Sequence, residues 1–435
     1  MVVMKKMYKV VMKADLIKRL CFHQKTVKLI KSFTLAVFVL LGVSLLAACA
    51  TLNAPEKPIA AVSFEDYQRE TLDNMRTRRS FQLPDKEKEL LWNGPQEWRP
   101  ANIEGKPQKG ILFVHGLGDS PWLFHDVAEE LVKHGFLVRT VLLPGHGTQP
   151  SDLLSTTAEE WQKIVYEQAY ALEDDVDGPV YLGGFSTGAN LVLEYAYSHS
   201  EIAGLMLFSP GFKSFPFDWL APLVSHIRPW IISPADATIP NQTPVRYMNV
   251  PTNGFAQFYR TSKVARRLLT QPYDKPVFMV VAQHDSVLNT DYLLKVFQQR
   301  FTNPQSRLVW YGDKPTGLTD TKRTLIREDK IPEQRISQFS HMGLLFSPEN
   351  PLYGSNGTLR ICLNGQGQQE MRSCEKGELV WYSDWGYQEE GRIHARLTFN
   401  PYFEWQSSIM VSTFDDTNSQ EAIFQNNVIQ KTGDQ

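Results

Sequence analysis

One serine in this chain has the surroundings of a nucleophile. Ser186 is the centre of the pentapeptide 184–188, Gly-Phe-Ser-Thr-Gly, which follows an apolar run at 180–182 and precedes a helix-like stretch from residue 189. Glycines suit a tight strand-to-helix turn because they have no Cβ atom, and such a turn holds its serine in a strained conformation above the strand. The helix N-terminus carries partial positive charge that favours a developing oxyanion. The pattern predicts a nucleophile at Ser186, with a purely structural turn serine as the alternative.

Nucleophilic acyl transfer also needs an acid that orients the base, and Asp285 is the best-placed candidate. It follows the apolar run 277–281 by a short loop. Sites in open α/β sheets gather at the carboxyl ends of strands, so a residue after such a run is well placed. Asp274, which precedes the run, and Asp313, which follows a later one, are the rivals.

The base is predicted at His341, in the sequence Phe-Ser-His-Met-Gly at 339–343. It follows the acid along the chain, in the order Ser, Asp, His. His284 adjoins Asp285 and cannot readily face it across a hydrogen bond. His394 lies near the end of the chain, beyond a polar, Gly-rich segment.

Two backbone N–H groups are predicted to bind the oxyanion. One belongs to Thr187, directly after the nucleophile, and the other to Leu117, in the sequence His-Gly-Leu-Gly-Asp-Ser at 115–120. Glycines in this loop allow the backbone to approach a substrate closely. The alternative interpretation is a Gly-rich turn between a strand and a helix.

Short apolar runs alternate with amphipathic stretches, which predicts right-handed crossovers and a mostly parallel sheet covered on both faces. Thr157 and Glu160 form a capping-box pattern, and Pro121 and Gly135 mark the start and the end of another helix. Strands are expected at 111–114, 136–143, 180–183, 202–208, 276–282 and, last, 307–311. Helices are expected at 64–79, 121–134, 161–172, 292–301 and 400–413.

Three segments interrupt this alternation. Residues 213–275 are rich in Pro and aromatic residues, 313–338 form a charged polar loop, and 351–396 are polar and Gly-rich. Five aromatic residues in or directly before the first segment are expected either to line an acyl channel or to form the core of a cap: Phe212, Phe215, Phe217, Trp219 and Trp230.

Together these candidates resemble the α/β-hydrolase superfamily, and within it the monoglyceride lipase and serine-aminopeptidase-like branch. The resemblance rests on His-Gly at 115–116, Pro-Gly-His-Gly at 144–147, the pentapeptide 184–188 and the loops of Asp285 and His341. It covers residues 110–343 and implies an α/β-hydrolase fold with a cap insertion at 213–275, to which this chain adds a polar C-terminal insertion at 351–396. The chain departs from that branch in the long stretch between acid and base and in the insertion after the base, which weakens analogies about substrate.

The N-terminal residues differ in composition from the rest of the chain. The first 48 residues contain nine of the 45 Lys and Arg residues but one of the 47 acidic residues, so the remainder has a formal net charge of −10. A basic region and an apolar run at 33–48 are typical of an export signal. The run ends Leu-Ala-Ala-Cys at 46–49, which resembles the lipobox of bacterial lipoproteins and implies a lipid on Cys49. A plain secretory signal is the alternative.

We therefore divide the chain into a signal peptide (1–48), a tether and N-terminal segment (49–100) and a hydrolase domain (101–435). The lipobox resemblance, without an aspartate after Cys49, implies a lipid-anchored protein of the bacterial cell envelope, on the outer membrane facing the periplasm. In an oxidising envelope Cys362 and Cys374 are expected to form a disulfide, with two free thiols as the alternative. The net-acidic body argues against nucleic acid as a partner.

The predicted function is hydrolysis of a small-molecule ester or lipid through an acyl-enzyme on Ser186. The same residues would serve a peptidase, an amidase or an acyltransferase. A non-enzymatic envelope lipoprotein that uses the fold for interaction is a third hypothesis, which the insertion 351–396 favours. No cofactor or metal is expected, because no Gly-Lys-Ser/Thr motif follows the elbow and the histidines lack paired spacing.

Overall fold

The computed structural model describes residues 62–414, apart from 102–103, 215 and 237–239. The predicted signal peptide, Cys49 and the tether up to residue 61 lie outside these described residues. Within the described part of the chain, no helix combines the length and the apolar composition needed to cross a bilayer.

An eight-stranded sheet forms the centre of the fold, in the order β1-β3-β2-β4-β5-β6-β7-β8. The edge strand β1 runs antiparallel to β3, and all other neighbours in this sheet are parallel. Most strands are continuous apolar runs, as expected where helices cover both faces. Their bounds are β1 Glu97–Trp98, β2 Lys109–Val114, β3 Phe136–Val141, β4 Val180–Phe185, β5 Gly204–Phe208, β6 Val277–Ala282, β7 Arg307–Tyr311 and β8 Thr324–Arg327.

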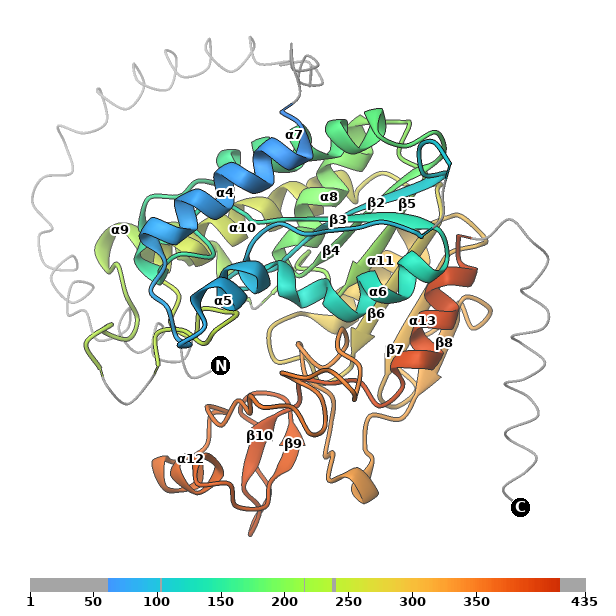
Figure 1. Ribbon diagram of the computed structural model, residues 1–435. Helices are drawn as coiled ribbons and strands as arrows, with labels where there is room; N and C mark the ends of the chain where they lie inside the picture. Colours follow the sequence, from blue (N-terminus) through green and yellow to red (C-terminus); the bar gives the residue numbers. More distant parts are fainter. Residues whose placement is uncertain (1–61, 102–103, 215, 237–239, 415–435) are drawn as a thin grey trace, which may run out of the picture. The chain divides into compact units, whose positions relative to one another are not determined.

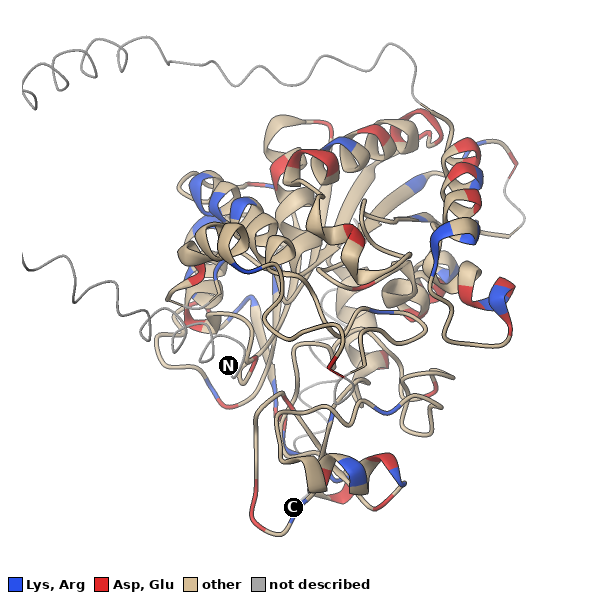
Figure 2. Ribbon diagram, turned by 90° about the vertical axis from the view of Figure 1, so that its left-hand side faces the viewer, with Lys and Arg blue, Asp and Glu red and all other residues tan. Residues whose placement is uncertain are grey.

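Helices cover both faces of the sheet (Figure 1). Along β2, Leu112 and Val114 belong to one apolar cluster with residues of α7, α8, α10 and α11, and Ile111 and Phe113 to another with α6 and α13. This alternation follows from the two-residue period of a strand. Charged side chains lie mainly on the outer helices and loops (Figure 2). The bounds are α4 Phe64–Arg78, α5 Lys86–Asn93, α6 His125–Lys133, α7 Ala158–Asp174, α8 Thr187–Ser198, α9 Ala221–Ile227, α10 Thr252–Leu268, α11 Thr290–Arg300 and α13 Phe403–Ser412.

Local sequence signals account for several helix ends. The capping box of α7 is formed, with Thr157 and Glu160 each bonding the backbone of the other. Gly135 follows α6 with φ 83°, a conformation that favours glycine and ends the helix. The helix expected from residue 121 begins as a 3₁₀ turn, Pro121–Phe124, before α6. The predicted α/β-hydrolase fold is thus confirmed.

The expectation that 307–311 is the last strand of the sheet is wrong. β8 lies inside the segment 313–338, which was expected to be a loop, and pairs in parallel with β7. Only Thr324 of its four residues is buried, because β8 is an edge strand. An edge strand of four residues is too short to show the apolar pattern that identifies a strand in a sequence.

The insertion 351–396 contains structure of its own. It carries α12, Gln368–Glu375, and a two-stranded parallel sheet of β9, Trp381–Ser383, and β10, His394–Arg396. A disulfide joins Cys362 to Cys374, and both residues pack with Val380 and Ala395 in a small apolar cluster. The insertion lies below the main sheet in the view of Figure 1.

Candidate active site

Ser186 forms the turn between β4 and α8, with φ 51° and ψ −112°. Positive φ is rare for a residue with a Cβ atom, and such strain gathers at functional sites. The flanking glycines are required by close contact. A Cβ atom on Gly184 would lie 2.5 Å from Ala189 N, and one on Gly188 would lie 1.9 Å from Val114 O. The turn is therefore pressed against the carboxyl end of β2.

The predicted acid and base face each other. His341 Nδ1 lies 2.6 Å from Asp285 Oδ2, and both side chains are almost fully buried. Asp285 follows β6, whereas His341 lies in the loop after β8. The second carboxylate oxygen accepts the N–H groups of Val287 at 2.8 Å and Leu288 at 3.1 Å. A carboxylate with these partners keeps the imidazole proton on Nδ1 and leaves Nε2 available as a base.

The imidazole of His341 also lies beside the serine turn. Its ring centroid is 4.7 Å from that of Phe185, the residue before Ser186. No hydrogen bond between Ser186 Oγ and His341 Nε2 is present in the described structure. Such bonds are often long in an unliganded site and tighten when a substrate binds. The structure thus brings the three predicted residues together, and their catalytic roles stay predictions.

The predicted oxyanion loop passes beside the same turn. A Cβ atom on Gly116 would lie 2.8 Å from the ring of Phe185. Leu117 N–H and Thr187 N–H have no acceptor among the described residues. Thr187 is the first residue of α8, where backbone donors have no partner within the helix. Both N–H groups are therefore free to bind a substrate oxygen.

The loop Pro-Gly-His-Gly at 144–147 supports the oxyanion loop from behind. The N–H of Gly118 donates to His146 Nε2 at 3.0 Å, while His146 Nδ1 lies 3.2 Å from the carbonyl of Leu143. Burial lowers the pKa of His146 to about 4, so this ring is neutral near pH 7. His115 accepts the N–H of Leu143 at 3.1 Å, and burial lowers its pKa well below the usual range. The sequence marked this loop but not the contact that His146 makes.

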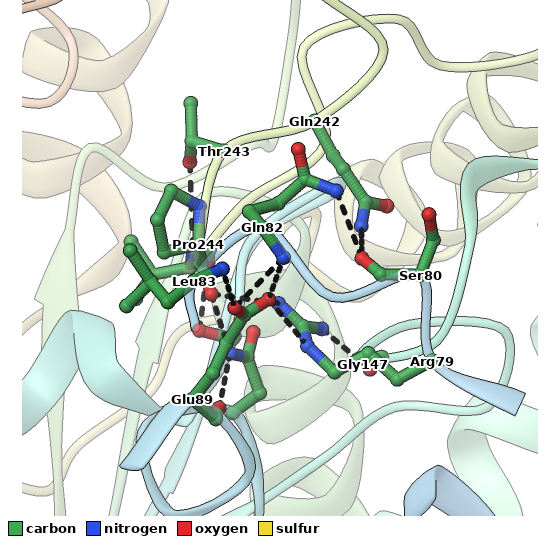
Figure 3. A network of polar contacts seen from close by, with 12 residues as sticks. Arg79, Ser80, Gln82, Leu83, Glu89, Gly147, Gln242, Thr243 and Pro244 are labelled. Carbon is green, nitrogen blue, oxygen red and sulfur yellow. Dashed lines mark hydrogen bonds and ion pairs between the residues drawn. The ribbon is translucent and has the colours of Figure 1, made fainter. Parts of the chain in front are cut away.

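Arg79, at the end of α4, fixes the same loop from the N-terminal segment (Figure 3). Its guanidinium donates to the carbonyls of Gly147 at 2.6 Å and Pro244 at 2.7 Å and forms an ion pair with Glu89 at 2.8 Å. Glu89 also accepts two backbone N–H groups from the turn before α5. Because the arginine and glutamate side chains are 1% and 0% exposed, their ion pair is fully buried.

Two buried carboxylates that the sequence analysis did not identify contact the loops of the acid and the base. Asp329 lies 2.6 Å from His284 Nδ1 and accepts the N–H of Phe339 at 3.3 Å. Asp384 accepts the N–H of His341 at 3.3 Å. No motif marks either residue, because each acts through a contact between distant segments.

The rival candidates lie elsewhere. Asp274 and Asp313 are exposed. His394 belongs to the small sheet, with Nδ1 3.1 Å from Ser383 Oγ. Of the aromatic residues in 213–275 and just before it, Phe212 is buried in the main core and Trp230 is half-buried, while Phe215 is outside the described residues. The expectation of a buried cap core is wrong for Phe217 and Trp219, which are 51% and 57% exposed.

Comparison with known proteins bears on the fold and the class of enzyme. Residues 105–312 match the family model described as serine aminopeptidase, S33, a span that includes the oxyanion loop, the serine turn and Asp285. The chain has an α/β-hydrolase fold. Its fold is that of the serine hydrolases, and His341 lies beyond the matched span.

Two curated relatives of this α/β-hydrolase come from bacilli. It is 33% identical over 97 residues to a thermostable monoacylglycerol lipase of Bacillus sp. (strain H-257), a match that covers 22% of this chain and 38% of the relative. It is 22% identical over 236 residues to a carboxylesterase of Bacillus subtilis (strain 168), covering 53% of this chain and 94% of that one. The chain therefore spans well under half of the first relative and nearly all of the second.

Solved structures similar to this α/β-hydrolase include two monoglyceride lipases. The enzyme of Saccharomyces cerevisiae matches at 17% identity and a TM-score of 0.41, over 50% of this chain and 82% of that one. That of Paleococcus ferrophilus matches at 21% identity and a TM-score of 0.39, over 54% and 87%. Among the described residues, no group of three or more His, Cys, Asp and Glu side chains could hold a metal ion.

Proposed function

We propose that this α/β-hydrolase cleaves carboxylic esters through an acyl-enzyme on Ser186. The 2.6 Å contact between His341 and Asp285, next to a serine held at positive φ, is the observation that carries the proposal. A hydroxyl is a weak nucleophile until a base removes its proton, and a neutral imidazole oriented by a carboxylate is suited to that task.

In this mechanism His341 Nε2 takes the proton of Ser186 as Oγ attacks the ester carbonyl. Asp285 stabilises the imidazolium that forms, and the N–H groups of Leu117 and Thr187 bind the oxyanion. His341 then protonates the leaving alcohol. In the second half of the reaction His341 takes a proton from water, the water oxygen attacks the acyl-enzyme, and the proton returns to Ser186 Oγ as the acid leaves. Donors fixed before the reaction contribute most to such catalysis, since one oxyanion donor is worth on the order of 100- to 1,000-fold in kcat.

Two observations favour ester and lipid substrates over peptides. The two bacterial relatives are named a monoacylglycerol lipase and a carboxylesterase. Four large apolar side chains that lie between Ser186 and α10 in the sequence are exposed, and such exposure suits contact with an acyl substrate: Phe217, Trp219, Leu223 and Ile227. The family model is described as an aminopeptidase, so hydrolysis of amino-terminal amides is the second candidate function.

The proposal places the enzyme at a membrane surface. The leader with its Leu-Ala-Ala-Cys sequence supports a lipid on Cys49 and a location in the bacterial envelope, facing the periplasm. Growth with a radiolabelled fatty acid should label the wild type but not Cys49→Ser. Equal labelling of both proteins would contradict the anchor.

The catalytic proposal is tested with a fluorophosphonate probe and a series of p-nitrophenyl esters. Ser186→Ala should lose labelling and at least about 10⁴-fold in kcat, because the nucleophile is absent. Ser198→Ala, at the exposed far end of the same helix α8, is the matched control and should behave as the wild type. Labelling of Ser186→Ala would refute the assignment. Faster hydrolysis of amino-acid p-nitroanilides than of esters would favour the peptidase.

A further inference from the structure

Asp384 links the loop of the acid to the loop of the base. It directly follows β9 in the insertion 351–396, and its side chain is almost completely buried. One carboxylate oxygen, Oδ2, accepts the N–H of Ser286, the residue after Asp285. The other, Oδ1, accepts the N–H of His341 itself. A single side chain therefore bonds the backbone next to the acid and the backbone of the base.

Asp329 makes a second link of the same kind from the other interrupting segment, 313–338. Its Oδ2 atom contacts Nδ1 of His284, the residue before Asp285, at 2.6 Å. The same oxygen accepts the N–H of Phe339, two residues before His341, at 3.3 Å. The two aspartates thus contact the residues on either side of Asp285, and each of them also accepts a backbone N–H group from the loop of His341.

We propose that Asp329 and Asp384 form a carboxylate clamp. By this we mean a pair of positioning residues that holds the side chains of Asp285 and His341 within hydrogen-bond distance of each other. This inference rests on the proposed function, because it assigns both segments a part in the same reaction. The clamp gives a role to the two segments that interrupt the regular alternation of strands and helices, 313–338 and 351–396.

The geometry makes such a clamp necessary. Asp285 and His341 lie on irregular loops, and the direct contact between them is one hydrogen bond of 2.6 Å. Loops have fewer constraints than strands, and a misplacement of about 1 Å can cost on the order of 100-fold in rate. Two carboxylates that bond four backbone or side-chain donors remove much of that freedom.

A carboxylate rather than an amide is required at position 384. An ionised aspartate accepts hydrogen bonds on both oxygens, whereas an asparagine has one acceptor and would turn an N–H group toward a backbone N–H. Burial raises the pKa of Asp384, and the nearby guanidinium of Arg396 opposes that effect. Arg396 ends β10, which pairs with β9, and Asp384 directly follows β9, so the small sheet positions both charged residues.

The inference is tested by the kinetics of Asp384→Asn with the best p-nitrophenyl ester. We expect kcat to fall on the order of 10- to 100-fold while KM changes less than about 2-fold, because the clamp touches the acid and base loops and not the substrate. Asp329→Asn should show the same pattern, and the double variant should lose less than the product of the two effects. Glu378→Gln, which neutralises an exposed carboxylate in the same insertion, is the matched control.

Each result has one interpretation. Retention of wild-type kcat by folded Asp384→Asn overturns the clamp. If that variant does not fold, Asp384→Asn with Arg396→Gln removes both charges. A folded double variant with the kcat loss supports the clamp, whereas loss of folding in both assigns Asp384 to stability alone and overturns it. Probe labelling of Ser186 in the wild type, together with normal kcat in the aspartate variants, would leave the proposed function intact while rejecting the clamp.

Discussion

At the scale of single residues, the oxyanion loop depends on one neutral imidazole. His146 Nε2 can accept the N–H of Gly118 only while that nitrogen carries no proton. Burial lowers the pKa of His146 to about 4, so the native state resists protonation down to this pH. The unfolded chain has an ordinary histidine, whose pKa is about 6.5.

The sign of the resulting pH dependence follows from these two values. Below about pH 6.5 the unfolded chain binds a proton that the native chain does not, so the free energy of unfolding decreases as the pH falls toward 4. At pH 5 the loss from His146 alone is about 2 kcal/mol, at 1.36 kcal/mol for each pKa unit. His115, whose pKa burial also lowers, adds to the effect in the same direction.

We predict that His146→Gln flattens the acid side of the stability profile. The glutamine amide can accept the N–H of Gly118 and does not titrate, so the change in unfolding free energy between pH 8 and pH 5 should shrink by about 2 kcal/mol. Urea unfolding at several pH values measures this change. His226→Gln, at an exposed position on α9, serves as the control. An unchanged slope in His146→Gln would show that this imidazole is not held neutral.

At the scale of elements, the disulfide-closed insertion supports the clamp. Cys362 and Cys374 pack with Val380, which precedes β9, and with Ala395 in β10. Asp384, which directly follows β9, bonds the loops of the acid and the base. Loss of the cross-link should therefore affect the site as well as the insertion.

We predict that Cys362→Ser with Cys374→Ser lowers both stability and kcat. Closing a loop of this length, with a sequence separation of 12 residues, stabilises a native protein by about 3 kcal/mol in the chain-entropy view. Thermal unfolding and ester kinetics with and without reductant measure the two effects. Reductant should change the wild type and leave the double variant unaffected. Alkylation of both thiols in unreduced wild type, mapped to their own peptides, would rule out the bond.

The elements also show which features a sequence reveals. The sequence revealed the three candidates Ser186, Asp285 and His341 because they occur in the order Ser, Asp, His within the alternation of strands and helices. Strands β2 to β7 could be located from their apolar runs. β8, β9 and β10 could not, because strands of three or four residues are too short to carry a periodic signal. Asp329 and Asp384 were missed for a different reason, since their partners lie in distant segments and only the fold brings them together.

At the scale of the whole molecule, the N-terminal segment is part of the hydrolase body and not only a tether. It lies before the span that matches the family model, yet β1 joins the main sheet and Arg79 bonds the loop at 144–147. The network in Figure 3 therefore connects α4 and α5 to the support of the oxyanion loop and to Pro244. A fragment that starts at residue 105 would lack these contacts.

We predict that Arg79→Met destabilises the folded protein by about 3–5 kcal/mol, because it leaves the carboxylate of Glu89 buried without its cation. Glu89→Gln combined with Arg79→Met should recover part of that loss, since the remaining amide is neutral and can still accept one N–H group. The support for Gly147 is lost in both variants, so kcat should fall even where the fold is kept. Denaturant unfolding and ester kinetics measure the two effects separately.

The same two helices supply the matched control for this prediction. Arg76 forms an ion pair with Glu87 at 3.3 Å, which joins α4 to α5 as the buried pair of Arg79 does. The side chains of Arg76 and Glu87 are both largely exposed. Water screens an exposed pair, so Arg76→Met should leave stability and kcat close to the wild type. An Arg79→Met protein no less stable and no less active than Arg76→Met would mean that the N-terminal segment lies against the body without supporting it. A large difference between the variants would show that burial makes this segment part of the active-site support.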